Sequence, residues 1–269
     1  MIIDFHTHVF HEKIAARTVS ALAESANLTP YSDGTAEGLL ASLKRAGANL
    51  AVNMPVLTKP TQFEVVTSFA KELNSRSYGN ERIISFGGIH PADEDIPGKV
   101  KRLFDEGFLG IKIHPDYQGA YIDDQAYVSI ISEAKKYGLT VLTHSGVDAA
   151  YVGQPIRCTP RRVLNLLGKV GGYDKFVLAH IGANEDFSSV FELLCGEDVY
   201  FDTALCLRLV EKELFYKIVE KHGDDRILFG SDSPWRDTGE EVKILKSYNF
   251  GRETEEKILS ENAKRLLGI

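Results

Sequence analysis

The sequence predicts an α/β fold, a single closed (β/α)8 barrel of parallel strands (a TIM barrel). Three observations predict it. Eight short apolar runs alternate with longer segments of helical spacing. The length of 269 residues suits one such barrel, and no linker rich in Pro, Gly or Ser divides the chain. We therefore expect one domain over residues 1–269, with an open parallel sheet as the structural alternative.

The predicted strands share a short apolar run. In chain order they are Ile2–Phe5, Leu50–Met54, Ile83–Ile89, Leu109–Ile113, Thr140–Thr143, Phe176–Ala179, Val199–Asp202 and Ile227–Phe229. The segment from Ala126 to Lys136 is typical of the amphipathic helices expected between strands. A final helix over Glu253–Leu267 is expected to cover the barrel wall.

Composition and charge exclude several classes of protein. A hydrophobic content of 43% with 26% charged residues is ordinary for a globular domain, and the net charge of −7 argues against a nucleic-acid or anionic-membrane surface. Cys158, Cys195 and Cys206 lack zinc-like spacing and do not suggest a disulfide framework. The start of the chain does not resemble a signal peptide, and no apolar run approaches the ~20 residues of a membrane span. We expect a cytoplasmic protein that binds a small molecule, and leave a homodimer open.

Histidines follow the predicted strands at the point where each strand ends. They are His6 and His8 after the first strand, His90 after the third, His114 after the fourth, His144 after the fifth and His180 after the sixth, with Asp232 after the eighth. Because parallel barrel strands deliver their carboxyl ends to one face, we expect these residues to meet there. His11 and His222 lie in helical or loop context and are expected at the surface.

His6 and His8 are two residues apart, so an extended strand directs both side chains to one side. That is a chelating geometry. Neutral imidazole and carboxylate suit Zn²⁺, Mn²⁺ or Fe²⁺, and three or four such ligands with an open position form a catalytic site. The alternative for each single histidine is a hydrogen-bonded residue at a strand end. Placement of so many at strand ends favours the metal or catalytic cluster.

Five segments carry a resemblance to a known family. They are Asp-Phe-His-Thr-His (4–8), Gly-Ile-Lys-Ile-His-Pro (110–115), Thr-His-Ser-Gly (143–146), Ala-His-Ile-Gly (179–182) and Phe-Gly-Ser-Asp-Ser-Pro-Trp (229–235). In this order, at successive strand ends, they resemble the amidohydrolase superfamily, in the amidohydrolase-related branch that also holds non-oxidative decarboxylases. The motifs span nearly the whole chain. They identify the family more specifically than they identify the substrate.

The resemblance implies a metal surrounded by His6, His8, His144 and Asp232, with His180 beside it as a catalytic group. Zn²⁺ is the expected metal, with Mn²⁺ or Fe²⁺ as alternatives. A divalent metal lowers the pKa of its water towards ~7, and Asp232 would serve as the general base that accepts the proton. His180 would polarise the substrate or protonate a leaving group.

The sequence departs from the binuclear members of the superfamily at the fourth strand. Those members carry there a carboxylated lysine that bridges two metals, whereas this chain has His114 at the strand end and Lys112 deeper in the strand. We therefore expect one divalent metal. Lys112 is expected either to contact substrate or to pair with Asp4 or Asp202, and His114 to contact substrate.

Mouth loops supply the remaining candidates for substrate binding. Arg157 lies in the loop after the fifth strand, where a guanidinium would bind a substrate carboxylate or phosphate, with a solvated arginine as the alternative. Tyr117 lies in the loop after the fourth strand. The predicted function is hydrolysis of a small amide, ester, lactone or phosphoester. The alternatives are non-oxidative decarboxylation of a small aromatic or unsaturated acid, and a catalytically inactive barrel that serves as a binding protein.

Overall fold

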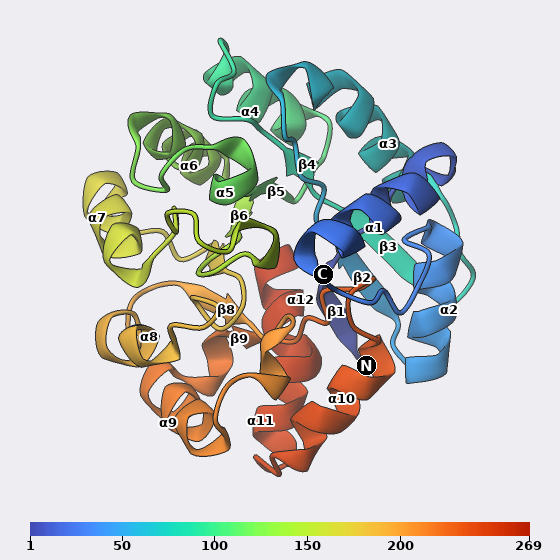
Figure 1. Cartoon of the computed structure of the whole chain (residues 1–269), viewed down its shortest axis with the longest axis vertical. Coiled ribbons are helices and arrows are strands. Elements are labelled where there is room, and N and C mark those ends of the chain that lie inside the picture. The colour runs from blue at the N-terminus through green and yellow to red at the C-terminus, as the bar shows by residue number, and fades with distance from the viewer.

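A computed structural model describes all residues from Met1 to Ile269. The strands are β1 (Ile3–Thr7), β2 (Leu50–Asn53), β3 (Arg82–Ser85), β4 (Gly87–Gly88), β5 (Gly110–Ile113), β6 (Thr140–Thr143), β7 (Phe176–Leu178), β8 (Tyr200–Asp202) and β9 (Ile227–Leu228). The helices are α1 (Glu12–Ala26), α2 (Ala36–Ala46), α3 (Phe63–Ser75), α4 (Ile96–Asp105), α5 (Pro115–Gln118), α6 (Gln125–Tyr137), α7 (Pro160–Val170), α8 (Phe187–Leu193), α9 (Lys212–His222), α10 (Thr238–Ser247), α11 (Arg252–Glu256) and α12 (Asn262–Leu267). Figure 1 shows the helices arranged around the strands.

All pairings between these strands are parallel, and they follow the order β1-β2-β3 and β4-β5-β6-β7-β8-β9. Only Phe86 separates β3 from β4, so the predicted third strand, Ile83–Ile89, is these two short pieces. Backbone hydrogen bonds join β1 to the segment after β9: Phe5 N donates to Phe229 O over 2.8 Å, and Asp232 N donates to His6 O over 2.8 Å. The ring of eight strands is therefore closed, and the predicted TIM barrel is confirmed.

Local sequence signals set the helix ends. Thr159 precedes α7 and accepts a hydrogen bond from Arg162 N, and Pro160 occupies the first turn, where its missing N–H costs nothing. α7 ends at Val170 and is followed by Gly171, whose φ of 70° is in the left-handed region that glycine tolerates. No helix is both long and apolar enough to cross a bilayer.

Two apolar layers enclose the strands. Alternate strand residues such as Phe5, Val52 and Leu142 fill an inner cluster, whereas a larger cluster lies between the strands and the surrounding helices. The predicted final helix forms as α11 and α12, joined by a π-helical turn at Lys257–Glu261. It packs on β9 and β1, and Phe229 N donates to Ile258 O over 3.0 Å.

Candidate metal centre

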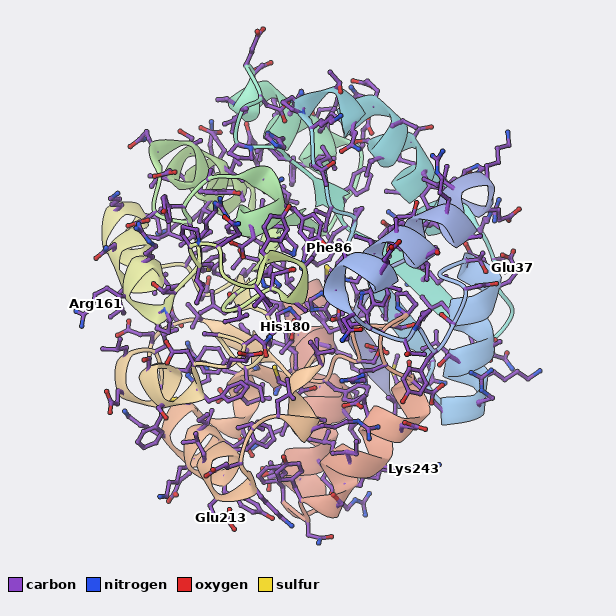
Figure 2. All side chains as sticks on the ribbon, in the orientation of Figure 1. Glu37, Phe86, Arg161, His180, Glu213 and Lys243 are labelled. Carbon is purple, nitrogen blue, oxygen red and sulfur yellow. The ribbon has the colours of Figure 1, made fainter.

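Five histidine rings form a row at the carboxyl ends of the barrel strands. Ring centroids are 5.1 Å apart for His8 and His6, 5.3 Å for His6 and His180, 4.7 Å for His180 and His144, and 4.3 Å for His144 and His114. Figure 2 shows His180 near the middle of the barrel in this view. The predicted convergence of strand-end histidines is therefore observed for these five residues.

His6, His8 and Asp232 form a compact group at one end of this row. Their candidate ligand atoms all lie within 4.8 Å of one another. His6 directs Nδ1 to Oδ2 of Asp202 over 2.8 Å, and His8 directs Nδ1 to the carbonyl of Met54 over 2.8 Å. Because each Nδ1–H donates a hydrogen bond, each Nε2 carries a lone pair, and both lone pairs face Asp232.

The distances from Asp232 to the two histidines are close to those between ligands of one cation. Nε2 of His8 lies 3.1 Å from Oδ1 of Asp232, and Nε2 of His6 lies 3.6 Å from the same oxygen. Ligand atoms ~2.1 Å from a tetrahedral or octahedral metal lie roughly 3.0–3.4 Å from one another. Three electron-rich atoms at this spacing would repel one another without a positive charge among them. The residues present therefore fit a divalent metal.

The charges of this group suit the same chemistry. Burial lowers the pKa of His6 well below its usual range, so the imidazole is neutral and free to bind a metal. Burial alone would raise the pKa of Asp232, but the contacts with His8 and His6 outweigh burial and lower it.

Asp232 has a φ of 69° and His180 a φ of 62°, so the backbone of both residues is in the left-handed region directly after their strands.

The ends of β1 and β9 are held together by Asp4. Its carboxylate accepts hydrogen bonds from Ser231 N (2.8 Å), Ser231 Oγ (2.6 Å) and Thr238 Oγ1 (2.7 Å). These bonds fix the loop that carries Asp232 against the strand that carries His6. Burial raises the pKa of Asp4 to about 6.

His144 and His114 lie at the other end of the row, together with Asp148. The structure places His144 in this second group, not with His6, His8 and Asp232. Nδ1 of His144 lies 2.9 Å from Nε2 of His180, and Nε2 of His114 lies 3.3 Å from Oδ2 of Asp148. Of the four ligands predicted for one metal, His6, His8 and Asp232 are adjacent, and His144 contacts His180 through Nδ1 while its Nε2 has no hydrogen-bond partner.

Lys112 lies beneath the row, fully buried, with Nζ 3.3 Å from Nε2 of His6. It forms no ion pair with Asp4, whose oxygens are occupied by Ser231 and Thr238, and none within 4.0 Å of Asp202. Lys112 therefore makes no direct ion pair with either predicted partner, although the charge of Asp202 partly offsets the effect of burial on its pKa. Burial lowers the pKa of Lys112 to about 8.

Arg157 and Tyr117 lie at the rim of the second group. Nη1 of Arg157 is 3.4 Å from Oδ1 of Asp116, and its side chain keeps 20% of its surface exposed. The guanidinium thus has a partner within the protein. The Tyr117 ring packs edge-on against His114 at 4.4 Å and against Tyr151 at 5.2 Å. Burial raises the pKa of Tyr117 well above its usual range, so the phenol stays neutral.

Two histidine predictions are wrong. His90 does not join the row, because its Nδ1 accepts the N–H of Ala92 over 3.1 Å within its own turn. His222 is buried, not exposed: its ring stacks on Phe201 at 4.0 Å, and its Nε2 lies 3.0 Å from the carbonyl of Val199. His11 is half-buried at the start of α1, where it accepts a hydrogen bond from Lys13 N.

Three carboxylates of the site were not predicted from the sequence as site residues. Asp202 is the last residue of β8 and contacts His6. Its position at a strand end could have identified it as a site residue, but the sequence suggested only a pairing with Lys112. Asp148 stands four residues after His144 in the following loop. Asp116 lies in the short helix α5 after His114. Neither Asp148 nor Asp116 follows a strand directly, so strand-end position could not identify them.

Comparisons with known proteins agree with this architecture. A TIM-barrel protein of Bordetella bronchiseptica has a TM-score of 0.74 at 18% identity, covering 99% of this chain and 98% of that one. A 5-carboxyvanillate decarboxylase of Novosphingobium aromaticivorans, with bound manganese and a nitrobenzoic acid, has a TM-score of 0.72 at 13% identity, covering 100% of this chain and 97% of that one. A probable 2-pyrone-4,6-dicarboxylic acid hydrolase of Acinetobacter baumannii has a TM-score of 0.66 at 15% identity, covering 100% and 99%.

Identities this low establish the shared fold alone. No curated protein matches the sequence. The sequence model of the family described as Amidohydrolase, however, matches residues 3–269, nearly the whole chain. The protein therefore belongs to the amidohydrolase family.

Proposed function

We propose that this protein is a metal-dependent hydrolase of a small amide, ester, lactone or phosphoester. One observation carries the proposal: Nε2 of His6, Nε2 of His8 and Oδ1 of Asp232 converge at the spacing of ligands around one divalent ion. Zn²⁺ suits two imidazoles and a carboxylate. Mn²⁺ is the alternative, since the decarboxylase of the same fold binds manganese.

When bound, the metal supplies Lewis acidity and lowers the pKa of a water molecule in its open coordination position. The protein's own residues then divide the proton transfers. Asp232 is anionic and lies beside the predicted metal position, so it accepts the proton of the attacking water. Asp202 and the carbonyl of Met54 keep the two imidazoles in the orientation that this requires.

The proton that Asp232 accepts from the water would pass to the leaving group, and His180 and His144 would orient that group. Nδ1 of His180 donates to the carbonyl of Ala204 over 3.0 Å, so its Nε2 accepts a hydrogen bond from Nδ1 of His144 over 2.9 Å. Both rings are buried, and the His180 ring lies between His144 and His6 in the row. His144, the predicted fourth metal ligand, also holds His180 in place through this bond, and His114 and Tyr117 form the adjoining wall.

Non-oxidative decarboxylation of a small carboxylic acid is the second candidate. It is supported by the similarity in fold to the 5-carboxyvanillate decarboxylase. The same residues would serve it, since a proton delivered from water through Asp232 would replace the departing carboxylate. The hydrolase is placed first because Arg157, the arginine at the rim, is already paired with Asp116 and is not free to bind a substrate carboxylate.

The test is turnover by protein loaded separately with Zn²⁺ and Mn²⁺, on a panel of lactones, amides, phosphoesters and aromatic acids. Hydrolysis is expected, and Asp232→Asn should lower turnover by ~10²-fold or more, because a positioned base contributes ~10²–10⁴ in rate. Asp174→Asn is the matched control, since Asp174 is exposed and precedes β7 at the opposite end of the barrel. Release of CO₂ from aromatic acids with no hydrolysis would select the second candidate. Bound metal with no turnover of any substrate would favour the inactive barrel.

A further inference from the structure

The side-chain amide of Gln118, the last residue of α5, is buried where three loops of the barrel mouth meet. Its Oε1 accepts hydrogen bonds from His114 N over 2.9 Å and from the hydroxyl of Tyr127 over 2.9 Å. Its Nε2 donates to the carbonyls of Leu57 over 3.0 Å and Ile89 over 2.8 Å. An amide offers two acceptor and two donor positions, so all four are used. The partners also fix which end of the amide is oxygen, because only the nitrogen can serve two carbonyls.

Gln118 crosses a gap in the backbone hydrogen bonding of the barrel. β2 pairs with β3 as far as Asn53, but the third strand breaks at Phe86 (labelled in Figure 2), and β4 pairs only with β5. No backbone hydrogen bond joins β4 to the segment that follows β2. The amide spans this gap, since Leu57 follows β2 and Ile89 follows β4.

The segment after β2 lies so close to β4 that it needs this link. Gly88 of β4 has no side chain, and a Cβ there would overlap Leu57 and lie 3.2 Å from the carbonyl oxygen of Pro55. Glycine thus allows the close approach, while Gln118 supplies the donors that a paired strand would otherwise provide. Buried carbonyls at such a contact need donors, because a buried polar group without a partner is costly.

The segment that the amide holds also carries the carbonyl that orients a candidate metal ligand. Met54 stands three residues before Leu57, and its carbonyl accepts Nδ1–H of His8 over 2.8 Å. Another partner of the amide, His114, follows β5 directly, and its ring stacks on that of His144 at 4.3 Å. One amide therefore sets backbone positions at both ends of the histidine row.

We propose that Gln118 is a positioning residue of the candidate metal centre. Its bond to Leu57 holds the Met54 carbonyl against His8, and its Oε1 holds the backbone at His114. Partners behind a metal ligand orient its imidazole, so a loosened Met54 carbonyl would let the His8 ring turn away from the metal position. The inference rests on the proposed metal-dependent function and adds to it a residue that acts through others.

Gln118→Glu tests the donor half of the amide, because it keeps the length and one acceptor oxygen and turns a second oxygen towards two carbonyls. Competition with a fluorescent zinc chelator measures Zn²⁺ affinity, and proton NMR of the zinc-loaded protein measures exchange of His8 Nδ1–H with water. We expect ~10-fold weaker Zn²⁺ binding, the low end of the loss for outer partners of metal ligands, and exchange of the His8 proton faster by a similar factor. Gln118→Met, of similar length and uncharged, should show the same changes.

Two controls separate positioning from a general loss of stability. Tyr127→Phe removes one hydrogen bond to the same amide but leaves its bonds to Leu57 and Ile89. It should therefore lower the melting temperature while Zn²⁺ affinity stays within ~3-fold of the wild-type value. Gln125→Glu makes the same change at an exposed glutamine of α6 and should alter neither quantity.

Wild-type Zn²⁺ affinity and proton exchange in a folded Gln118 variant would overturn the inference, and so would losses in Tyr127→Phe equal to those in Gln118→Glu. Failure of both Gln118 variants to fold would also overturn it, because the amide would then be needed for the barrel and not for the site. Each of these outcomes leaves metal binding by the wild-type protein intact. If the wild-type protein binds no Zn²⁺, the proposed function fails, and this inference fails with it.

Discussion

Asp202 is the residue on which two histidines of the site depend. Its Oδ2 accepts a hydrogen bond from Nδ1 of His6 over 2.8 Å, and its Oδ1 accepts the backbone N–H of His180 over 2.9 Å. It is fully buried at the end of β8. A single carboxylate thus fixes which nitrogen of His6 faces Asp232 and holds the left-handed backbone at His180. Outer carboxylates of this kind orient metal-binding imidazoles and raise their basicity.

We expect Asp202→Asn to weaken metal binding by ~10–100-fold while the barrel stays folded, because an amide offers one acceptor oxygen where the carboxylate offers two. Competition with a fluorescent zinc chelator measures the affinity, and imidazole nitrogen NMR reports the tautomer of His6. Asp174→Asn should leave both unchanged. An Asp202 variant with normal affinity and an unchanged His6 tautomer would contradict the positioning role.

His222, the last residue of helix α9, connects this helix to the barrel by stacking and hydrogen bonds. The ring stacks on Phe201 of β8, Nδ1 accepts the N–H of Gly196 over 3.2 Å, and Nε2 donates to the carbonyl of Val199 over 3.0 Å. Both ring nitrogens are thus used by the neutral imidazole. Burial lowers the pKa of His222 to about 4.

This pKa makes the stability of the protein depend on pH. The pKa of His222 in the folded state lies below its value of about 6.5 in the unfolded chain, so its stabilising effect is present above about pH 6.5 and is lost as pH falls towards 4. Between about pH 7.5 and pH 5, the wild-type free energy of unfolding should fall by about 2 kcal/mol more than that of His222→Gln, which cannot titrate. Urea unfolding at the two pH values measures the difference. Parallel losses in both proteins would mean that His222 is already exposed to solvent.

At the scale of the whole molecule, the candidate metal centre lies on the seam where the barrel closes. His6 and His8 come from β1, and Asp232 follows β9 near the other end of the chain. Backbone hydrogen bonds cross the same seam, from Asp232 N to His6 O over 2.8 Å and from His8 N to Ser233 O over 2.6 Å. A metal held there would link the first and last strands, so binding and barrel stability should be coupled.

We expect about one tightly bound divalent metal per chain, and its removal should lower the melting temperature by at least ~5 °C. A ligand at 1,000 times its dissociation constant stabilises by ~4 kcal/mol, and 1 kcal/mol shifts the midpoint by ~2–4 °C in a domain approaching this size. Elemental analysis and thermal melts before and after chelation measure both quantities. His8→Ala should melt at the same temperature with and without added metal. Two metals per chain, or a carboxylate adduct on Lys112 in the intact mass, would contradict a mononuclear site.

The sequence by itself determined the barrel and the residues delivered to its mouth. Strand periodicity and the position of a histidine directly after a strand are local properties, and a parallel barrel brings all carboxyl strand ends to one face. The convergence of His6, His8, His180 and Asp232 follows from that rule, although the same rule also placed His90 there. The apolar pattern did not predict the break at Phe86, which divides the third strand into β3 and β4.

The tertiary structure decided what each side chain contacts. The tautomer of His6 depends on Asp202, 196 residues away, and the Nε2 of His144 is left unpaired by a chain of bonds that runs through His180 to Ala204. His90 and His222 have the same side chain as the site histidines but bind backbone groups elsewhere. Ring orientation is set by partners distant in sequence and by burial, and neither can be read from a residue's neighbours along the chain.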